Sequence, residues 1–221
     1  MSVMTVTGPV EAKTLGVTTI HEHLIFDGSW NYEPSDDPEI RKMAESPLRM
    51  DTVGWARKFG YRHLDNCKRL DVEESIEEIT YFKSAGGRTV VDQTPAATCR
   101  DPKALRTIAD ATGLNIIMGG GYYVQSAHPE SLKERSVQDI AEELIREITV
   151  GVDDTGIRMG VIGEIGTDDP FTSAEEKVLR ASAIAQASTG TPLSVHHNIW
   201  GRHGPRILDI VKEEGADLKH T

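Results

Sequence analysis

The sequence predicts an α/β fold in which parallel strands and helices alternate as a (β/α) barrel. Two observations carry this prediction. Short apolar runs rich in β-branched residues alternate with amphipathic stretches of helical period, as βαβ units do. Polar residues also follow several of these runs, and the carboxyl ends of barrel strands form the functional face. No glycine-rich nucleotide loop follows the first strand, which disfavours a doubly wound open sheet.

The composition is that of an ordinary globular protein. The chain has 221 residues, of which 38% are hydrophobic and 27% charged, and we expect a single domain over residues 1–221. The formal net charge is −11 and no basic block is present, which argues against nucleic acid and anionic membrane surfaces as partners.

The cysteines and the apolar runs restrict the class of protein further. Cys67 and Cys99 are too few and too far apart for a disulfide framework or a thiolate zinc site. The first ten residues lack a basic leader and an apolar core, and no apolar run reaches membrane-spanning length. We therefore expect a cytoplasmic protein.

The first barrel strand is expected at residues 17–23 and carries a His-x-His pair. Side chains alternate between the two faces of a strand, so His21 and His23 project to the same side. Two imidazoles on one face can hold a divalent metal ion, although a solvated pair in a loop is the simpler alternative.

A long polar insertion follows, from about Gly28 to Leu70. Loops of this length are usually functional lids or disordered segments. Its aromatic residues favour an ordered segment, either a cover over the site or a surface excursion with a small core of its own. These aromatic residues are Trp30, Tyr32, Trp55 and Phe59.

The remaining helices and strands show the same start and stop signals in turn. Asp71, Ser136 and Ser173 are expected helix N-caps because each has an acidic residue three positions later. Glycines close most of the helices. We expect helices at 71–86, 101–113, 136–151, 173–190 and 205–215, and strands at 89–92, 115–118, 159–164 and 192–196.

The expected strand ends bring together the composition of a metal site. Asp92 ends the second strand, Glu164 the fourth and His196 the fifth, and the first strand adds its two histidines. A carboxylate between imidazoles can bridge two cations. Asp92 is expected either to orient a ligand histidine or to cap the following turn.

The other histidines have weaker claims to a role in the site. The side chain of His197 is expected on the opposite face of the strand from that of His196, and His203 lies in the loop that follows. His63 and His128 lie in polar loops, where we expect surface positions.

Several motifs together resemble the phosphotriesterase family of the amidohydrolase superfamily. The chain opening at 5–10 and 15–24 is similar to that of the family, and later motifs follow in the family's order. These later motifs are Gly-Gly-Arg-Thr-Val-Val-Asp at 86–92, Gly-Tyr-Tyr at 121–123, Gly-Glu-Ile-Gly-Thr at 163–167 and Pro-Leu-Ser-Val-His at 192–196.

The resemblance implies a hydrolase on a TIM barrel with two divalent metal ions, zinc being the expected element. It implies His21 and His23 as ligands of the more buried ion, Glu164 as the bridge, and His196 as a ligand of the more exposed ion. Tyr123 matches an aromatic position that contacts substrate.

The resemblance also implies further strands. Family members continue with a sixth strand that supplies a histidine and an eighth that supplies a metal-binding, proton-accepting aspartate. This chain ends at Lys219-His220-Thr221, so we expect about the first five βα units, with the catalytic aspartate lying beyond residue 221. His220 is a poor substitute for the sixth-strand ligand.

The function expected from the sequence is hydrolysis of an ester-type substrate by a metal-bridging hydroxide. A lactone, carboxylic ester or phosphotriester is the expected small-molecule partner, and a homodimer is the expected assembly. A TatD-like metal-dependent deoxyribonuclease is the alternative enzyme, since it shares His-x-His and Gly-Glu-Ile-Gly motifs. A catalytically incomplete fragment or non-catalytic binding protein is the third hypothesis.

Overall fold

The computed structural model describes residues 2–221. The strands are β1 (Ser2–Thr5), β2 (Gly8–Glu11), β3 (Val17–Glu22), β4 (Phe26–Asp27), β5 (Lys68–Arg69), β6 (Gly87–Asp92), β7 (Asn115–Met118), β8 (Ile162–Thr167) and β9 (Leu193–His197). The helices are α1 (Pro38–Ala44), α2 (Val53–Lys58), α3 (Val72–Ser84), α4 (Pro102–Thr112), α5 (Val137–Thr149), α6 (Ser173–Thr189) and α7 (Gly204–Glu213).

Parallel strands form the centre of the fold. β3, β6 and β7 pair in that order, and β8 pairs with β9, all in parallel. A backbone pair joins the two groups, because Gly120 N–H donates to the Gly163 carbonyl at 2.9 Å and Gly163 N–H returns the bond at 2.8 Å. The α/β class with a parallel sheet is therefore confirmed.

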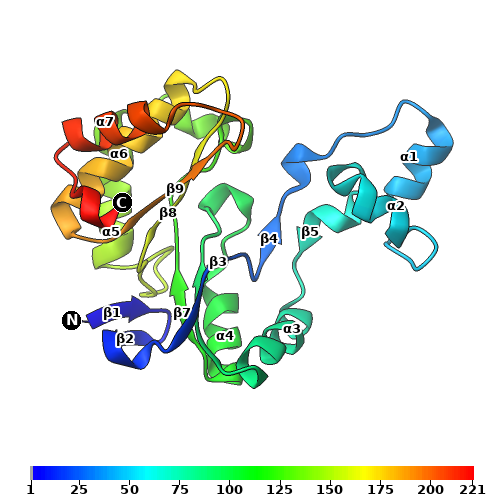
Figure 1. Cartoon of the computed structure of the whole chain (residues 1–221), viewed down its shortest axis with the longest axis horizontal. Coiled ribbons are helices and arrows are strands. Elements are labelled where there is room, and N and C mark those ends of the chain that lie inside the picture. The colour runs from blue at the N-terminus through cyan, green and yellow to red at the C-terminus, as the bar shows by residue number, and fades with distance from the viewer. Residues whose placement is uncertain (1) are drawn as a thin grey trace.

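Helices cover the outer side of the strands (Figure 1). α3 packs against α4 on one side, and α5, α6 and α7 pack in succession on the other. The strand interiors form the core, where Ile116, Met118, Ile162 and Ile165 are completely buried. The β1–β2 hairpin joins this core through the backbone, since Val6 N–H donates to the Ile116 carbonyl at 2.8 Å.

Most helix signals in the sequence lie where they were expected. Asp71 caps α3 by accepting from two backbone N–H groups, and Ser136 with Asp139 forms a reciprocal capping box on α5. α4 begins at Pro102 and ends at Thr112, and it is capped by Gly113, whose φ of 69° is the left-handed conformation that glycine adopts without strain.

Several predicted boundaries are shifted, among them the start of β6 at Gly87, two residues earlier than predicted. β8, which corresponds to the predicted fourth strand, begins at Ile162 and runs through Thr167, three residues later than predicted, although Gly160 N–H already bonds to the Met118 carbonyl. The N-cap of α6 is Thr172 and not Ser173. Both residues have a glutamate three positions later, but Glu175 is almost completely buried and also accepts from the N–H groups of Gln125 and Asp168. These tertiary contacts select the first capping pair.

The 28–70 insertion forms an arm that extends away from the helix-covered strands (Figure 1). The short antiparallel pair β4–β5 holds its two ends together, and α1 and α2 lie within it. Trp55 packs against Phe59 and His63, with ring centroids 5.2 and 6.3 Å away. The arm is thus ordered and has a small core of its own. No helix within residues 2–221 combines the length and apolar character needed to cross a bilayer.

Candidate functional site

Three of the parallel strands bring three histidines to one glutamate. His21 lies on β3 and His23 directly after it, Glu164 on β8 and His196 on β9. The rings of His21 and His23 are 5.3 Å apart, as expected for two side chains on the same face. The side chains that were predicted from the sequence to share a site therefore lie close together.

Glu164 is the hub of this group, and its side chain is only 5% exposed. His21 Nε2 lies 3.2 Å from one carboxylate oxygen, Oε2, and His23 Nε2 lies 3.3 Å from the other. His196 Nδ1 lies 2.6 Å from Oε2. Glycines flank this position, and a Cβ atom on Gly163 would lie 2.6 Å from the Ser194 carbonyl oxygen. Glycine is therefore required for the close approach of β9.

The charge of Glu164 is stabilised by its imidazole neighbours. Burial by itself raises the pKa of a carboxyl group. Hydrogen bonds with His196 and His23, and their charges, outweigh this effect and lower the pKa of Glu164 to about 2. The group is thus an anion at neutral pH, as a metal-ligating carboxylate must be.

A buried hydrogen-bond chain supports His23. Its Nδ1 lies 3.1 Å from the hydroxyl oxygen of Thr94. Asp92, fully buried, accepts from Thr94 N–H at 3.1 Å and from Leu24 N–H at 2.7 Å. Burial raises the pKa of Asp92, while these hydrogen bonds oppose the rise. Asp92 therefore caps the turn at Thr94, which is one of the two roles considered for it, and the hydroxyl of Thr94 in turn contacts His23.

Tyr123 contacts the other side of His196. With the His196 proton on Nδ1, which faces the carboxylate, Nε2 accepts from the Tyr123 hydroxyl at 3.0 Å. Burial, followed by the negative charge of Glu164, raises the pKa of Tyr123. The phenol is thus protonated and serves as a hydrogen-bond donor at the mouth of the site.

The donor atoms fit a divalent metal ion. One ligand atom each from His21, His23 and Glu164 lie within 4.8 Å of one another. Two imidazole nitrogens with a carboxylate oxygen are a donor set that zinc accepts readily. His196 is outside this group of three, and both of its ring nitrogens are hydrogen-bonded.

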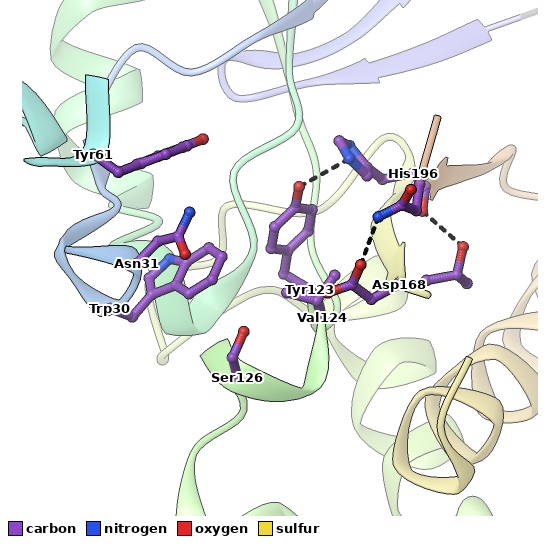
Figure 2. Close-up of a pocket in the computed structure, with 10 residues that line it drawn as sticks. Trp30, Asn31, Tyr61, Tyr123, Val124, Ser126, Asp168 and His196 are labelled. Carbon is purple, nitrogen blue, oxygen red and sulfur yellow. Dashed lines mark hydrogen bonds between the residues drawn. The ribbon is translucent and has the colours of Figure 1, made fainter. Parts of the chain in front are cut away.

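A cavity of about 180 Å³ opens beside Tyr123 and His196 (Figure 2). Three of its wall residues come from the arm and were not assigned to a site from the sequence: Trp30, Asn31 and Tyr61. Asp168 and Asn198, which follow β8 and β9, were also missed. The aromatic content of the insertion and the position of Asp168 after a strand were the available signals.

The remaining histidines lie outside the cluster, and two of them correct the sequence analysis. His63 is completely buried against Trp55, and neither of its ring nitrogens has a hydrogen-bond partner. His128 is half-buried and bonds to the Tyr123 carbonyl at 2.7 Å. Both were expected on the surface. Polar neighbours in sequence did not predict burial, because the rings of Trp55 and Tyr122 pack against these histidines once their segments are folded.

His203, His197 and His220 make other contacts. His203 pairs with Asp169 at 3.1 Å and stacks on the ring of His197. His220 pairs with Asp217 at 3.3 Å.

Comparisons with known proteins agree with the geometry. A phosphotriesterase-related protein from Nematostella vectensis is 37% identical over 220 residues, which cover 98% of this chain and 63% of that protein. The N-acetyltaurine hydrolase of Homo sapiens is 38% identical, with coverage of 99% and 63%. This chain thus spans somewhat less than two thirds of the length of these relatives.

Two solved structures are also similar. A resiniferatoxin-binding protein from Rhodobacter sphaeroides superimposes with a TM-score of 0.96 at 42% identity, covering 100% of this chain and 62% of that one. The phosphotriesterase homology protein from Escherichia coli, with phosphate in its active site, has a TM-score of 0.75 at 28% identity over 94% and 61% of the two chains. The sequence model of the phosphotriesterase family matches residues 1–221, and the chain belongs to this family.

Proposed function

We propose that the protein carrying this chain is a metal-dependent hydrolase of ester-type bonds. The observation that carries the proposal is the convergence of His21, His23 and the ionised Glu164 within 4.8 Å, beside a cavity at the strand ends. Family membership supports it and favours it over the deoxyribonuclease alternative. Lactones, carboxylic esters and phosphotriesters are the proposed substrates.

The proposed cofactor is a pair of divalent ions, with zinc as the expected element. His21 and His23 would hold one ion, His196 the other, and Glu164 both. Bound divalent ions supply a nucleophile from water at neutral pH and polarise the oxygen of the bond to be cleaved.

The chain's own residues prepare this site. The Thr94 hydroxyl lies 3.1 Å from Nδ1 of His23, and in the tautomer with the proton on Nδ1 this hydroxyl accepts it, which leaves Nε2 free to ligate a metal ion. Tyr123, held as a neutral phenol, can donate a hydrogen bond to a substrate oxygen once its bond to His196 is released. Glu164 remains charged and balances the positive charge of the site.

We also propose that this chain supplies about the first five βα units of an eight-stranded barrel, with the arm as an insertion after the first strand. The greater length of the relatives supports this proposal. The proton-accepting aspartate would then come from a later strand, as the family resemblance implies.

A second candidate substrate class is an N-acyl amide. The relatives named N-acetyltaurine hydrolase favour it, since amide and ester hydrolysis place the same demand on a polarised carbonyl group.

One panel tests these alternatives. The protein is supplied with zinc or manganese and assayed on an aryl ester, a lactone, a phosphotriester, N-acetyltaurine and a DNA oligonucleotide. We expect turnover of at least one carbonyl ester or lactone that disappears in His21→Ala and persists in a His220→Ala control. Degradation of the oligonucleotide and of no other compound, or no turnover of any compound, would reject the proposal.

A further inference from the structure

The cavity beside the metal cluster has the composition of a site for a cation. Its lining combines three aromatic rings, one carboxylate and neutral polar groups, and the structure of residues 2–221 places no lysine or arginine in it. The one basic side chain, His196, already has hydrogen-bond partners at both ring nitrogens. The lining residues are Trp30, Asn31, Tyr61, Tyr123, Val124, Ser126, Thr167, Asp168, His196 and Asn198.

The aromatic rings enclose the space from two sides. Trp30 and Tyr123 meet with ring centroids 5.7 Å apart and an angle of 64° between their planes, so they form a corner. Figure 2 shows Trp30 and Tyr61 on one side of the cavity and Tyr123 and Asp168 on the other. The face of an aromatic ring attracts a cation, and tryptophan attracts it most strongly.

The Asp168 carboxylate is held in place without a cationic partner. Its Oδ1 accepts from the Asn198 amide at 2.7 Å and from Asp169 N–H at 2.8 Å. Within the described part of the chain, the ion pairs of this region join His203 to Asp169 and the three cluster histidines to Glu164, and none reaches Asp168. A fixed carboxylate that lacks a counter-ion at a cavity wall favours a cationic ligand and repels an anionic one.

The size of the cavity restricts what enters. A volume of about 180 Å³ lies below the ~300–1,000 Å³ usual for drug-sized ligands, so it suits one small head group. Its position beside His196 and Tyr123 places such a group next to the strand-end cluster.

We infer that this cavity binds an alkylammonium group of the substrate, between the rings of Trp30, Tyr61 and Tyr123 and against the carboxylate of Asp168. The inference rests on the proposed hydrolase function for its substrate, which becomes an ester or amide with an amine or quaternary ammonium close to the bond to be cleaved. An anionic head group, such as a sulfonate, is disfavoured by the same charges.

Binding of matched head groups to the metal-free protein tests the inference directly. Choline, its neutral isostere 3,3-dimethyl-1-butanol and the anionic 3,3-dimethylbutanoate have similar shapes and differ in charge. We expect choline to bind at least about tenfold more tightly than the neutral compound in calorimetric titrations, and the anion to bind most weakly.

Four variants test which side chains account for the preference for choline. Asp168→Asn keeps the shape of the side chain and should reduce the preference for choline to within about twofold. Trp30→Leu should weaken choline binding about tenfold, whereas Trp30→Phe retains a ring and should lose about threefold or less. Trp200→Leu is the matched control, because Trp200 is 83% exposed and lies outside the cavity lining, and it should bind as the unaltered protein does. Circular dichroism confirms that each variant is folded.

The outcomes separate the two proposals. Equal or tighter binding of the neutral or anionic compound, or a choline preference unchanged in Asp168→Asn, overturns the cation site whatever the protein hydrolyses. A choline preference that the variants remove, in a protein that hydrolyses none of the panel, supports the cation site and rejects the proposed hydrolase function.

Discussion

The strand-end cluster of His21, His23, Glu164 and His196 differs from the 28–70 arm in how its buried polar groups are hydrogen-bonded. In the cluster, Glu164 contacts three imidazoles, and His23 and His196 each have a partner on their second nitrogen. In the arm, several buried polar atoms have no hydrogen-bond partner. Among residues 2–221 there are seven such side-chain atoms, and five of them lie in the arm: Trp30 Nε1, Tyr32 Oη, both ring nitrogens of His63, and Arg69 Nε.

This difference predicts unequal local stability. A buried polar group without a partner costs about 1–3 kcal/mol, and the arm consists of short helices between two ends that one two-residue antiparallel pair holds together. Segments of this kind open at lower free energy than core strands do. We therefore expect the cluster to be the rigid part of the site and the arm, which supplies cavity walls rather than ligands, to be the adjustable part.

The largest effect on zinc binding is expected from substitution of Glu164, which contacts all three histidines of the cluster. Glu164→Ala should weaken zinc binding by more than about 100-fold, because removal of a ligand exceeds the 10–100-fold cost of losing a residue that only orients one. Elemental analysis and competition with a chelator measure it. Glu130→Ala, on an exposed side chain, is the control, and zinc content equal to that of the unaltered protein in Glu164→Ala would refute the assignment.

Stability measurements sharpen the contrast between the two regions. Met118→Ala, at a completely buried position of β7, should lower the global free energy of unfolding by about 2–5 kcal/mol. Trp55→Ala should change it by less than about 1 kcal/mol while accelerating amide hydrogen exchange between residues 38 and 67. Denaturant titration and exchange mass spectrometry distinguish these results. A global loss in Trp55→Ala as large as that in Met118→Ala would show that the arm unfolds with the core.

Acid should weaken the cluster of the metal-free protein. The pKa of Glu164 is lowered from 4.5 to about 2 on folding, so its charge stabilises the folded state above pH 4.5, and this contribution is lost as the pH falls from 4.5 towards 2. A shift of this size corresponds to about 3 kcal/mol. The measurement is the difference in unfolding free energy between the unaltered protein and Glu164→Gln as a function of pH. A difference that does not change over this interval would contradict the expectation.

A smaller effect is expected from the residue that orients His23. Thr94→Val removes the hydroxyl that hydrogen-bonds with Nδ1 of His23 and preserves the side-chain shape, so zinc binding should weaken about 10–100-fold. Thr107→Val, at an exposed position of α4, is the matched control. Unchanged zinc affinity would mean that packing alone orients the ring.

Local sequence signals were sufficient for most strands and helices outside the arm. The helix caps at Asp71 and Ser136 lie where predicted, and β7 has the predicted bounds. The His-x-His spacing also correctly predicted two rings on one face. These features depend on residues within a few positions of each other, and parallel strands then place their ends at one edge.

Contacts between residues distant in the chain decided the rest. The choice of Thr172 over Ser173 depends on Glu175 reaching Gln125, fifty positions earlier in the chain. The cavity joins Trp30 to Tyr123 across more than ninety positions. By itself the sequence determined the order of strands and helices and the residues at the strand ends, because periodicity and capping are local. Only the tertiary structure decided which arm residues meet those ends, because packing across the chain has no local signature.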